Sequence, residues 1–357
     1  MIYLYDIGNK QLRFNENGKF RILMISDFHA GSRRKGFEDG NPYSPKVREA
    51  VEALVAECNP DFVMVGGDQC IGHSPEYLYN AFTDIMAPVI ERGIPWAHVY
   101  GNHDREMAMT TAQQQTVYEK IPHCFSERGP ADIFGVCNYV VPVYSSDGKR
   151  IAYNMFCLDS NREISDYIQQ FGIDSEDNNI LLPFAFGSRS VQAMPFFQQV
   201  MWYYNTSRDM ERENKGKIPA LMFMHNPCIE FNLIFRNPEE CDMYGEKREA
   251  VCCSELNTGL FTACLERGDV TGIFCGHEHM NAYHGKYCGI ILGYDSCVGY
   301  DMSAHDDVRG GRVIDISEDG GIETRHIKLM SIMGERALRR PDFFEGGLNY
   351  FIRNTHL

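Results

Sequence analysis

Five short apolar segments that each run directly into polar residues constrain the fold of this chain more than any other feature. Each segment has the length of a β-strand, and each is followed by Asp, Asn or His side chains. The segments are residues 21–25, 62–65, 94–100, 220–224 and 270–275. A sixth apolar run, residues 151–158, leads into Asp159. This repetition predicts a fold in which several strands end at one functional surface.

Helical patterns lie between some of these segments. Apolar residues between positions 47 and 58 recur on one helical face, with Pro45 at the expected start of the helix. Residues 75–92 and 255–267 show a similar pattern, and Gly268 is a suitable helix end. Strands that alternate with helices favour βαβ units and a largely parallel sheet. Because ligands bind beyond the carboxyl ends of such strands, we expect the five polar segments to converge on one site of one sheet.

Turn signals predict a β-hairpin near each end of the chain. Residues 11–14 and 19–25 flank the Asn17-Gly18 pair, which favours a tight turn. Residues 309–328 are expected to close as a second hairpin around the turn residues 318–321.

Two other stretches do not follow the alternation of strands and helices. Residues 161–190 are polar and weakly periodic, so we expect them to form a pocket wall. Residues 330–357 form a tail that the pattern does not assign. No linker rich in Pro, Gly or Ser interrupts the chain, which favours a single domain over residues 1–357.

The formal net charge of −15 limits the partners of the chain. An acidic surface repels duplex nucleic acid, and a small phosphorylated substrate would need a local positive centre that bound metal cations can supply. No apolar stretch is long enough to span a membrane, and the N-terminus does not resemble a secretory signal, which predicts a cytoplasmic protein without a membrane partner. The thirteen scattered cysteines are expected to be buried free thiols of a reducing compartment, and the oligomeric state stays open.

Three of the five polar segments are weak signals when each is taken alone. Asp27 and His29 would share one face at a strand end and reach one cation, but Asp-x-His is more often a solvated turn. Gly67-Asp68 also favours a turn, and its functional interpretation is a carboxylate that bridges two metals. His225 after an apolar strand is more often a hydrogen-bonded histidine of the core.

The other two polar segments are more specific. In residues 101–104 the amide oxygen of Asn102 can bind a metal without adding negative charge. His103 can then donate a proton, and Asp104 can hold its ring in one orientation. His277 and His279 stand two residues apart after a strand and can serve one metal or two neighbouring metals, while the residue between them is expected to point away.

The number of candidate ligands fits two metal ions. Each ion needs about four protein ligands, with water in the remaining positions. One shared carboxylate among seven candidates gives eight ligand contacts, which matches two ions. The candidates are Asp27, His29, Asp68, Asn102, His225, His277 and His279.

The order of these motifs resembles the calcineurin-like metallophosphoesterase superfamily from about residue 20 to residue 315. A finer resemblance, to the small purple-acid-phosphatase-like branch of plants and fungi, rests on residues 91–96, 135–142 and 251–261. The resemblance implies an α/β fold, a β-sandwich of two mixed sheets flanked by helices (αββα). It also implies an active site at the carboxyl ends of strands.

The resemblance further assigns a role to each motif residue. It implies that Asp27, His29 and His279 hold the first metal, that Asn102, His225 and His277 hold the second, and that Asp68 bridges them. The implied ions are two divalent or trivalent metals per chain: Fe, Mn or Zn. A metal-activated water would attack phosphorus while His103 protonates the leaving oxygen and Asp104 orients His103.

The implied activity is hydrolysis of phosphate esters, with phosphomonoesters as the leading substrates. A phosphodiesterase for nucleotides or glycerophosphodiesters is the alternative, and an inactive scaffold with the same fold is a third. The expected pocket walls, residues 31–44 and 161–190, do not separate them. Arg33, Arg34 and Lys35 could reach a second phosphate, but a basic loop of this kind is more often simply solvated. Purple acid phosphatases carry a Tyr three residues after the bridging Asp, where this chain has Ile71, so we expect no tyrosinate ligand and no purple colour.

Overall fold

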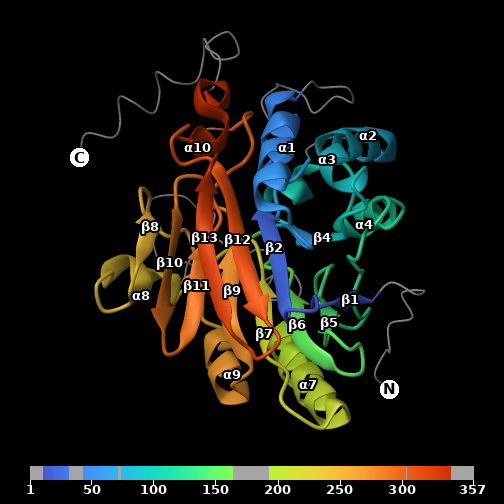
Figure 1. Ribbon diagram of the computed structural model, residues 1–357, viewed down its shortest axis with the longest axis vertical. Helices are drawn as coiled ribbons and strands as arrows, with labels where there is room; N and C mark the ends of the chain where they lie inside the picture. The colour runs from blue at the N-terminus through green and yellow to red at the C-terminus, as the bar shows by residue number, and fades with distance from the viewer. Residues whose placement is uncertain (1–10, 32–42, 71–73, 164–192, 303, 339–357) are drawn as a thin grey trace, which may run out of the picture.

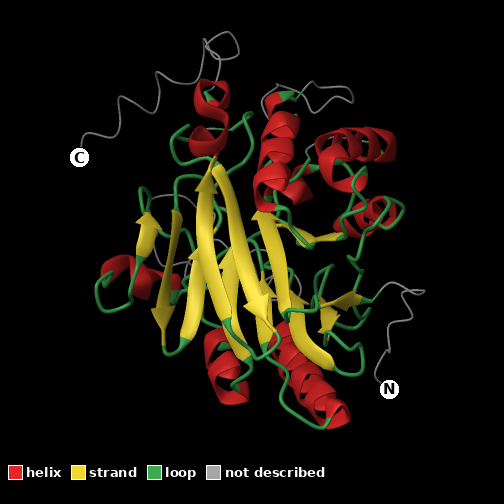
Figure 2. Cartoon of the chain, viewed as in Figure 1, coloured by secondary structure: helices red, strands yellow, loops and turns green. Residues whose placement is uncertain are grey.

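Two mixed β-sheets face each other, and helices cover both outer faces (Figure 1; Figure 2). The computed structural model describes residues 11–31, 43–70, 74–163, 193–302 and 304–338. This layered arrangement confirms the α/β sandwich that the family resemblance implied. It corrects the single, largely parallel sheet that the alternation of strands and helices predicted, because later strands pair antiparallel and form edges of both sheets.

The larger sheet has eight strands. Their spatial order is β1 (Leu12–Arg13), β5 (Tyr139–Tyr144), β6 (Ile151–Cys157), β7 (Ala220–Phe223), β9 (Val270–Cys275), β11 (Ile290–Tyr294), β10 (Ala282–Tyr287) and β8 (Tyr244–Glu246). The central strands β6, β7, β9 and β11 run parallel to their neighbours in this group. Their carboxyl ends therefore open on the same edge of the sheet.

The smaller sheet has five strands. Their spatial order is β13 (Ile322–Lys328), β12 (Gly310–Ser317), β2 (Lys19–Ile25), β3 (Phe62–Val65) and β4 (Trp96–His98). Strands β2, β3 and β4 are parallel, and β12 pairs antiparallel with both β2 and β13. The pairing of β12 with β13 confirms the closing hairpin predicted over residues 309–328.

Most helices sit on the two outer faces of the sandwich. These helices form two groups. The buried residues of the first group belong to the apolar cluster around the five-stranded sheet, and those of the second group pack on the outer face of the eight-stranded sheet. The first group is α1 (Lys46–Cys58), α2 (Pro75–Ile85), α3 (Ala87–Ile90), α4 (Thr111–Tyr118) and α10 (Leu329–Met333). The second group is α7 (Phe197–Asn214), α8 (Phe231–Arg236) and α9 (Leu260–Arg267). Two short 3₁₀ helices, η1 (His103–Glu106) and η3 (Gly334–Ala337), complete the described elements.

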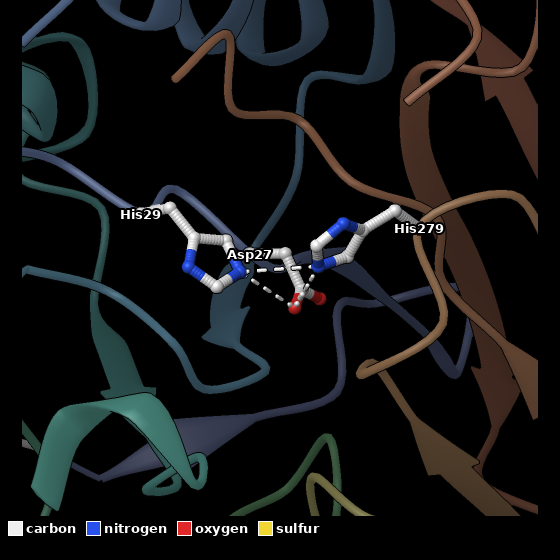
Figure 3. A group of neighbouring side chains, drawn as sticks. All are labelled: Asp27, His29 and His279. Carbon is white, nitrogen blue, oxygen red and sulfur yellow. Dashed lines mark hydrogen bonds and ion pairs between the residues drawn. The ribbon is translucent and has the colours of Figure 1, made fainter. Parts of the chain in front are cut away.

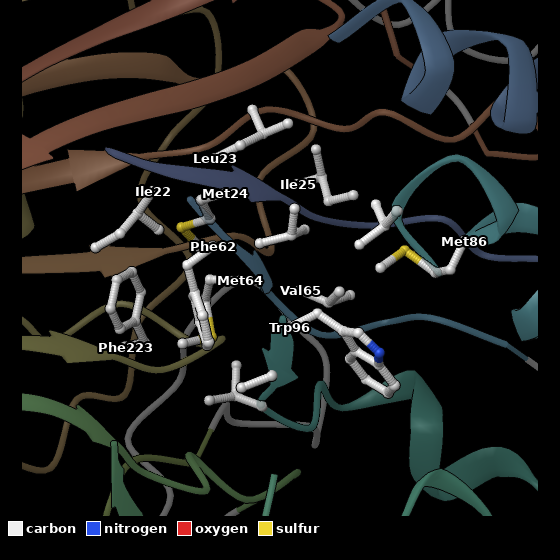
Figure 4. Close-up of a cluster of buried hydrophobic side chains, with 14 of the residues drawn as sticks. Ile22, Leu23, Met24, Ile25, Phe62, Met64, Val65, Met86, Trp96 and Phe223 are labelled. Atoms are coloured by element: carbon white, nitrogen blue, oxygen red, sulfur yellow. The ribbon is translucent and has the colours of Figure 1, made fainter. Parts of the chain in front are cut away.

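The alternation of side chains along the strands builds two apolar layers. Phe223 of β7 points between the sheets, where it meets the side chains of β2 and β3 (Figure 4). Its neighbour Met222 belongs to the separate cluster beneath the helices of the outer face. Both faces of β7 are therefore buried, as expected for a central parallel strand that is apolar throughout. The result is a rigid frame from which the polar residues after each strand extend.

The helices follow the sequence predictions with two differences. Helix α1 spans the predicted residues, and α9 ends at Gly268 in the left-handed conformation, as expected. The start of α9 lies later than predicted because Gly259, with φ 83°, occupies its N-cap. Residues 75–92 form two helices that break at Met86. Pro88 lacks the amide hydrogen that would continue the hydrogen bonds of α2.

The predicted N-terminal hairpin is wrong. The turn itself forms, since the backbone N–H of Gly18 donates to the carbonyl of Asn15 at 2.8 Å. However, β1 pairs in parallel with β5 of the eight-stranded sheet, whereas β2 belongs to the other sheet. The buried ring of Phe14 packs against that of Phe20 in β2, with ring centres 6.1 Å apart, so the turn joins the two layers.

Several expectations concern residues that the structure describes only in part. Most of the expected pocket walls lies outside the described residues, as do Ile71, Arg33, Arg34 and Lys35. Of the tail, the part up to Leu338 is described and contains most of α10 and all of η3. All thirteen cysteines are described; they are free thiols, most of them buried. None of the helices in the described ranges combines the length and apolar character needed to cross a bilayer.

Candidate metal centre

The residues after β2, β3 and β4 meet the residues after β7 and β9 where the two sheets adjoin. Hydrogen bonds continue past the strand ends and fix these loops: the N–H of Asp27 donates to Gly67 at 3.0 Å, and that of His29 donates to Asp68 at 2.9 Å. Across the sheets, the N–H of His277 donates to Asp27 Oδ2 at 3.2 Å. The predicted convergence thus involves both sheets and not one.

Asp27, His29 and His279 form a first group of facing side chains (Figure 3). Asp27 Oδ1 lies 3.3 Å from His279 Nε2 and 3.5 Å from His29 Nε2. The two imidazole nitrogens are 3.1 Å apart. Two ligands bonded to one ion at about 2.1 Å, roughly at right angles, are separated by about 3 Å. The spacing therefore fits three ligands of a single metal ion.

Asp68, His225 and His277 form a second group beside the first. Asp68 Oδ2 lies 3.1 Å from His225 Nε2 and 3.5 Å from His29 Nε2, so one carboxylate oxygen reaches both groups. Asn102 joins them through the loop after β4, because the N–H of the next residue, His103, donates to Asp68 Oδ1 at 2.8 Å. Six of the seven side chains named from the sequence thus lie in two adjoining groups, and Asn102 lies on a loop that is bonded to them.

Several buried atoms of these residues make no well-aligned hydrogen bond among the described residues, although some of them lie as close to one another as ion pairs. They are Asp27 Oδ1, Asp68 Oδ2, Asn102 Oδ1, His225 Nε2 and His277 Nε2. A buried polar atom without a partner costs about 1–3 kcal/mol. Five such atoms around one point are the environment that a bound cation would satisfy, and the mixture of imidazole nitrogens and carboxylate oxygens suits a transition metal.

The second polar atom of several of these side chains is held firmly. Ser26 Oγ donates to Asp27 Oδ2 at 2.6 Å, and His225 Nδ1 lies 2.7 Å from the carbonyl oxygen of Gly66. Because a carbonyl only accepts, Nδ1 of His225 carries a hydrogen, so Nε2 is the nitrogen that can bind a metal once it has lost its own proton. Hydrogen bonds of this kind orient imidazole and carboxylate ligands toward a metal.

Backbone strain is concentrated at the same residues. Asp27, His29, Asp68 and His277 have φ values of 58°, 48°, 52° and 77°, in the left-handed region that residues other than glycine seldom adopt. Each such residue costs of order 1–3 kcal/mol, and residues of this kind cluster at functional sites. The strained loops turn the side chains inward from the strand ends.

Two glycines allow the loops to approach each other closely. At Gly67, with φ 101°, a Cβ atom would overlap the His225 ring. At Gly101, a Cβ atom would overlap the carboxylate of Asp68. These contacts explain why glycine precedes both Asp68 and Asn102.

The carboxylates and imidazoles shift one another's pKa. Burial raises the pKa of Asp27 and of Asp68, but the positive charge of His225 and the interactions with the other histidines together outweigh it and hold both carboxyl pKa values well below their usual range. Burial lowers the pKa of His225, but the charges of Asp68 and Asp27 raise it to about 10. For His277, burial and the neighbouring His225 lower the pKa to about 3. Both carboxylates are therefore ionised and available as ligands.

His103 stands at the edge of the centre and pairs with Glu106. Its Nδ1 lies 2.9 Å from Glu106 Oε1, and its ring centre lies 5.1 Å from that of His29. Burial lowers the pKa of His103, but the hydrogen bond with Glu106 and the charge of Asp68 outweigh it and raise the pKa to about 9. At neutral pH the imidazole holds a proton.

The role expected for Asp104 is corrected by its contacts. Its fully buried carboxylate accepts hydrogen bonds from the backbone N–H groups of Asp68, Gln69 and Gly101 at 2.8–2.9 Å. Asp104 therefore joins the loops after β3 and β4, and Glu106 is the residue that holds His103. Sequence reasoning missed Glu106, although its spacing of three residues from His103 puts both side chains on one helical face.

Asp104→Asn is expected to lower the stability of the fold. The amide has only one accepting oxygen for three backbone donors, and its NH₂ group would face one of them. Hydrogen bonds to a charged group contribute about 1.5–3 kcal/mol each, so we expect a loss of about 2 kcal/mol in the free energy of unfolding. Denaturant unfolding of the variant measures it, with Asp61→Asn as the control, whose carboxylate accepts one exposed backbone N–H. Equal stability of Asp104→Asn and the unaltered chain would show that Asp104 does not stabilise the fold by joining the loops after β3 and β4.

The chain is similar to known proteins in sequence and in fold. The family model described as calcineurin-like phosphoesterase matches residues 20–281. A protein of Arabidopsis thaliana named probable inactive purple acid phosphatase 14 is 30% identical over 320 residues, 83% of this chain and 74% of that protein. Phosphatase DCR2 of Saccharomyces cerevisiae is 26% identical and covers 78% of this chain and 47% of its own length. A solved dimetal phosphatase from Danio rerio aligns with 87% of this chain and 99% of its own at a TM-score of 0.53, and at 14% identity this likeness concerns the fold alone.

Proposed function

Because this chain belongs to the calcineurin-like phosphoesterase family, with purple-acid-phosphatase-like relatives in plants and yeast, we propose that it is a dinuclear-metal phosphomonoesterase. The observation that carries the proposal is the pair of adjoining ligand groups with unpartnered buried atoms, joined by Asp68 Oδ2. A single metal ion would leave one of the two groups without a partner.

The ligands divide between two ions of iron, manganese or zinc. Asp27, His29 and His279 hold the first, and Asn102, His225 and His277 hold the second, with Asp68 between them. When bound, such a pair lowers the pKa of a water molecule and attracts the phosphoryl oxygens. Asp27 and His225 are pre-oriented by the hydrogen bonds described above, which lowers the reorganisation needed on binding.

Charge at the centre favours a phosphomonoester over a diester. Two divalent ions carry about four positive charges, against the two ionised carboxylates Asp27 and Asp68. At neutral pH a monoester carries close to two negative charges, as a phosphorylated side chain does, and a diester has one fewer ionisable oxygen. The more highly charged substrate gains more from the same centre.

His103 is proposed to donate the proton to the leaving oxygen. Glu106 holds Nδ1 of His103, which leaves Nε2 as the nitrogen that can give a proton to a substrate. The imidazole is charged at neutral pH, as a general acid has to be before the reaction. Glu106 thus acts as a positioning residue, which keeps the ring aimed and protonated.

Glu106→Gln is expected to lower kcat by about ten-fold with little change in KM, since the orientation and charge of His103 weaken while the ligands stay in place. The basic limb of the pH–rate profile should also move to lower pH, because a lost carboxylate lowers the pKa of the imidazole. Glu106→Asp should restore part of the rate. Steady-state kinetics over a pH series measure both effects, and an unshifted profile would show that Glu106 does not act through His103.

The choice between monoester and diester is tested with matched aryl substrates. Metal-reconstituted protein is assayed with an aryl phosphate and the corresponding bis-aryl phosphate. We expect the higher kcat/KM with the monoester. A higher kcat/KM with the diester would reverse the order and favour phosphodiesterase activity.

The second candidate is a binding scaffold that has lost catalysis, and the name of the Arabidopsis thaliana relative favours it. The complete set of seven ligand candidates and the proton-bearing His103 favour an active enzyme. Metal analysis of protein purified without chelator separates the two. Less than one transition metal per chain, with no hydrolysis after manganese, iron or zinc is added, would support the scaffold.

A further inference from the structure

A thiol lies at the edge of the candidate metal centre. Cys252 is exposed in the loop that follows β8, and its sulfur lies within 4.8 Å of a ring nitrogen of His277 and of the carboxylate of Glu278. We propose that Cys252, His277 and Glu278 form a further metal site, which takes a thiophilic ion such as Zn²⁺. This site shares no ligand with the first group, Asp27, His29 and His279. It shares only His277 with the second group.

Glu278 provides an observation independent of the thiol. The side chain is 4% exposed, and its Oε1 accepts a hydrogen bond from the backbone N–H of Cys252. The other oxygen, Oε2, is buried and makes no well-aligned hydrogen bond among the described residues, although the Tyr294 hydroxyl lies close enough to the carboxyl group to shift its pKa. The first contact fixes the carboxylate against the Cys252 loop, and Oε2 is the oxygen that a cation would bind.

The ligand set selects the kind of ion. Sulfur, imidazole nitrogen and carboxylate oxygen together are typical of zinc, whereas Mg²⁺ and Ca²⁺ prefer oxygen alone. Ligands of a tetrahedral zinc ion are separated by about 3.3–3.8 Å, so atoms that lie within 4.8 Å of one another reach these separations by a shift of at most about 1.5 Å. Cys252 lies in a loop without helix or strand and can make this adjustment. A fourth position stays open to water.

The shared histidine links this site to the centre. His277 is also a proposed ligand of the dinuclear pair, so an ion on Cys252 competes for it. Excess zinc should therefore inhibit the enzyme through Cys252, a consequence that rests on the proposed function. Binding of zinc at Cys252 does not rest on that function and is measured separately.

Alkylation of cysteine tests the site directly. Manganese-loaded protein is treated with iodoacetamide in the presence and absence of added Zn²⁺, and each modified cysteine is quantified by mass spectrometry. Zinc should slow alkylation of Cys252 by about ten-fold, because only a free thiolate reacts quickly. The other exposed cysteine, Cys288, is the internal control and should react unchanged. Equal rates at Cys252 with and without zinc would overturn the proposal, and so would equal protection by Mg²⁺.

Matched serine variants extend the test. Cobalt(II) bound to a thiolate gives a near-ultraviolet charge-transfer band, which Cys252→Ser should abolish and Cys253→Ser should retain. Cys253 is the suitable control because its half-buried sulfur accepts a hydrogen bond from Asn232 at 3.1 Å. A band that survives in Cys252→Ser would refute the site.

The two proposals fail in distinguishable ways. If zinc protects Cys252 but the protein hydrolyses no phosphate ester, the proposed function is wrong and the thiol site stands. If the protein is active and Cys252→Ser and Cys253→Ser are inhibited by the same zinc concentration, the inhibitory thiol site is wrong and the function stands.

Discussion

Asp68→Asn is expected to deplete both metal ions from the protein. One carboxylate oxygen of Asp68 lies 3.5 Å from a nitrogen of the first ligand group and 3.1 Å from one of the second. The amide removes the negative charge that both ions share. Elemental analysis after metal loading and dialysis should fall from about two ions per chain to below about one.

This substitution separates metal binding from folding. Asp68 has φ 52°, and Asn tolerates the left-handed conformation as well as Asp does, so the loop can keep its shape. Circular dichroism checks that the fold is retained. Asp84→Asn, which removes a surface carboxylate paired with Arg48, is the control and should bind metal normally. Unchanged metal content in Asp68→Asn would show that Asp68 does not bridge two ions.

His103→Ala is expected to leave the metals bound and to lower kcat by about 10²–10⁴-fold for substrates with poor leaving groups. The side chain carries a proton at neutral pH and is held by Glu106, but it belongs to neither ligand group. Aryl phosphates that span a range of leaving-group pKa values measure the effect.

The dependence on the leaving group identifies the role of His103. A proton donor matters most when the departing oxygen is strongly basic and little when it leaves readily as an anion. His123→Ala, which removes a partly exposed imidazole from a loop after α4, is the control and should show normal rates throughout. A loss of equal size across the series would mean that His103 binds substrate without donating the proton.

The positions of the ligands could be predicted from sequence because each is encoded locally. An apolar run such as residues 62–65 marks a strand, and the Gly-Gly-Asp that follows marks where the chain leaves it. Parallel strands bring such positions to one edge, whatever lies between them. The alternation pattern did not reveal that β2 and β7 belong to different sheets, since the last four residues of each strand are apolar and fully buried.

The errors arose where the outcome depends on contacts across the fold. The turn at Gly18 is local and forms, but which strand pairs with β1 depends on an edge strand far along the chain. Asp104 and Glu106 are both carboxylates close to His103 in sequence. Only the packing of the loop after β3 against the loop after β4 directs Asp104 to the backbone and leaves Glu106 for the ring.

Activity measured while metal is returned to chelator-treated protein tests the dinuclear phosphomonoesterase most directly. The rate on an aryl phosphate should be negligible without metal, rise as manganese, iron or zinc is added, and reach its plateau at about two ions per chain. A plateau at one ion per chain would contradict the dinuclear centre. Two bound ions without hydrolysis would contradict the proposed activity.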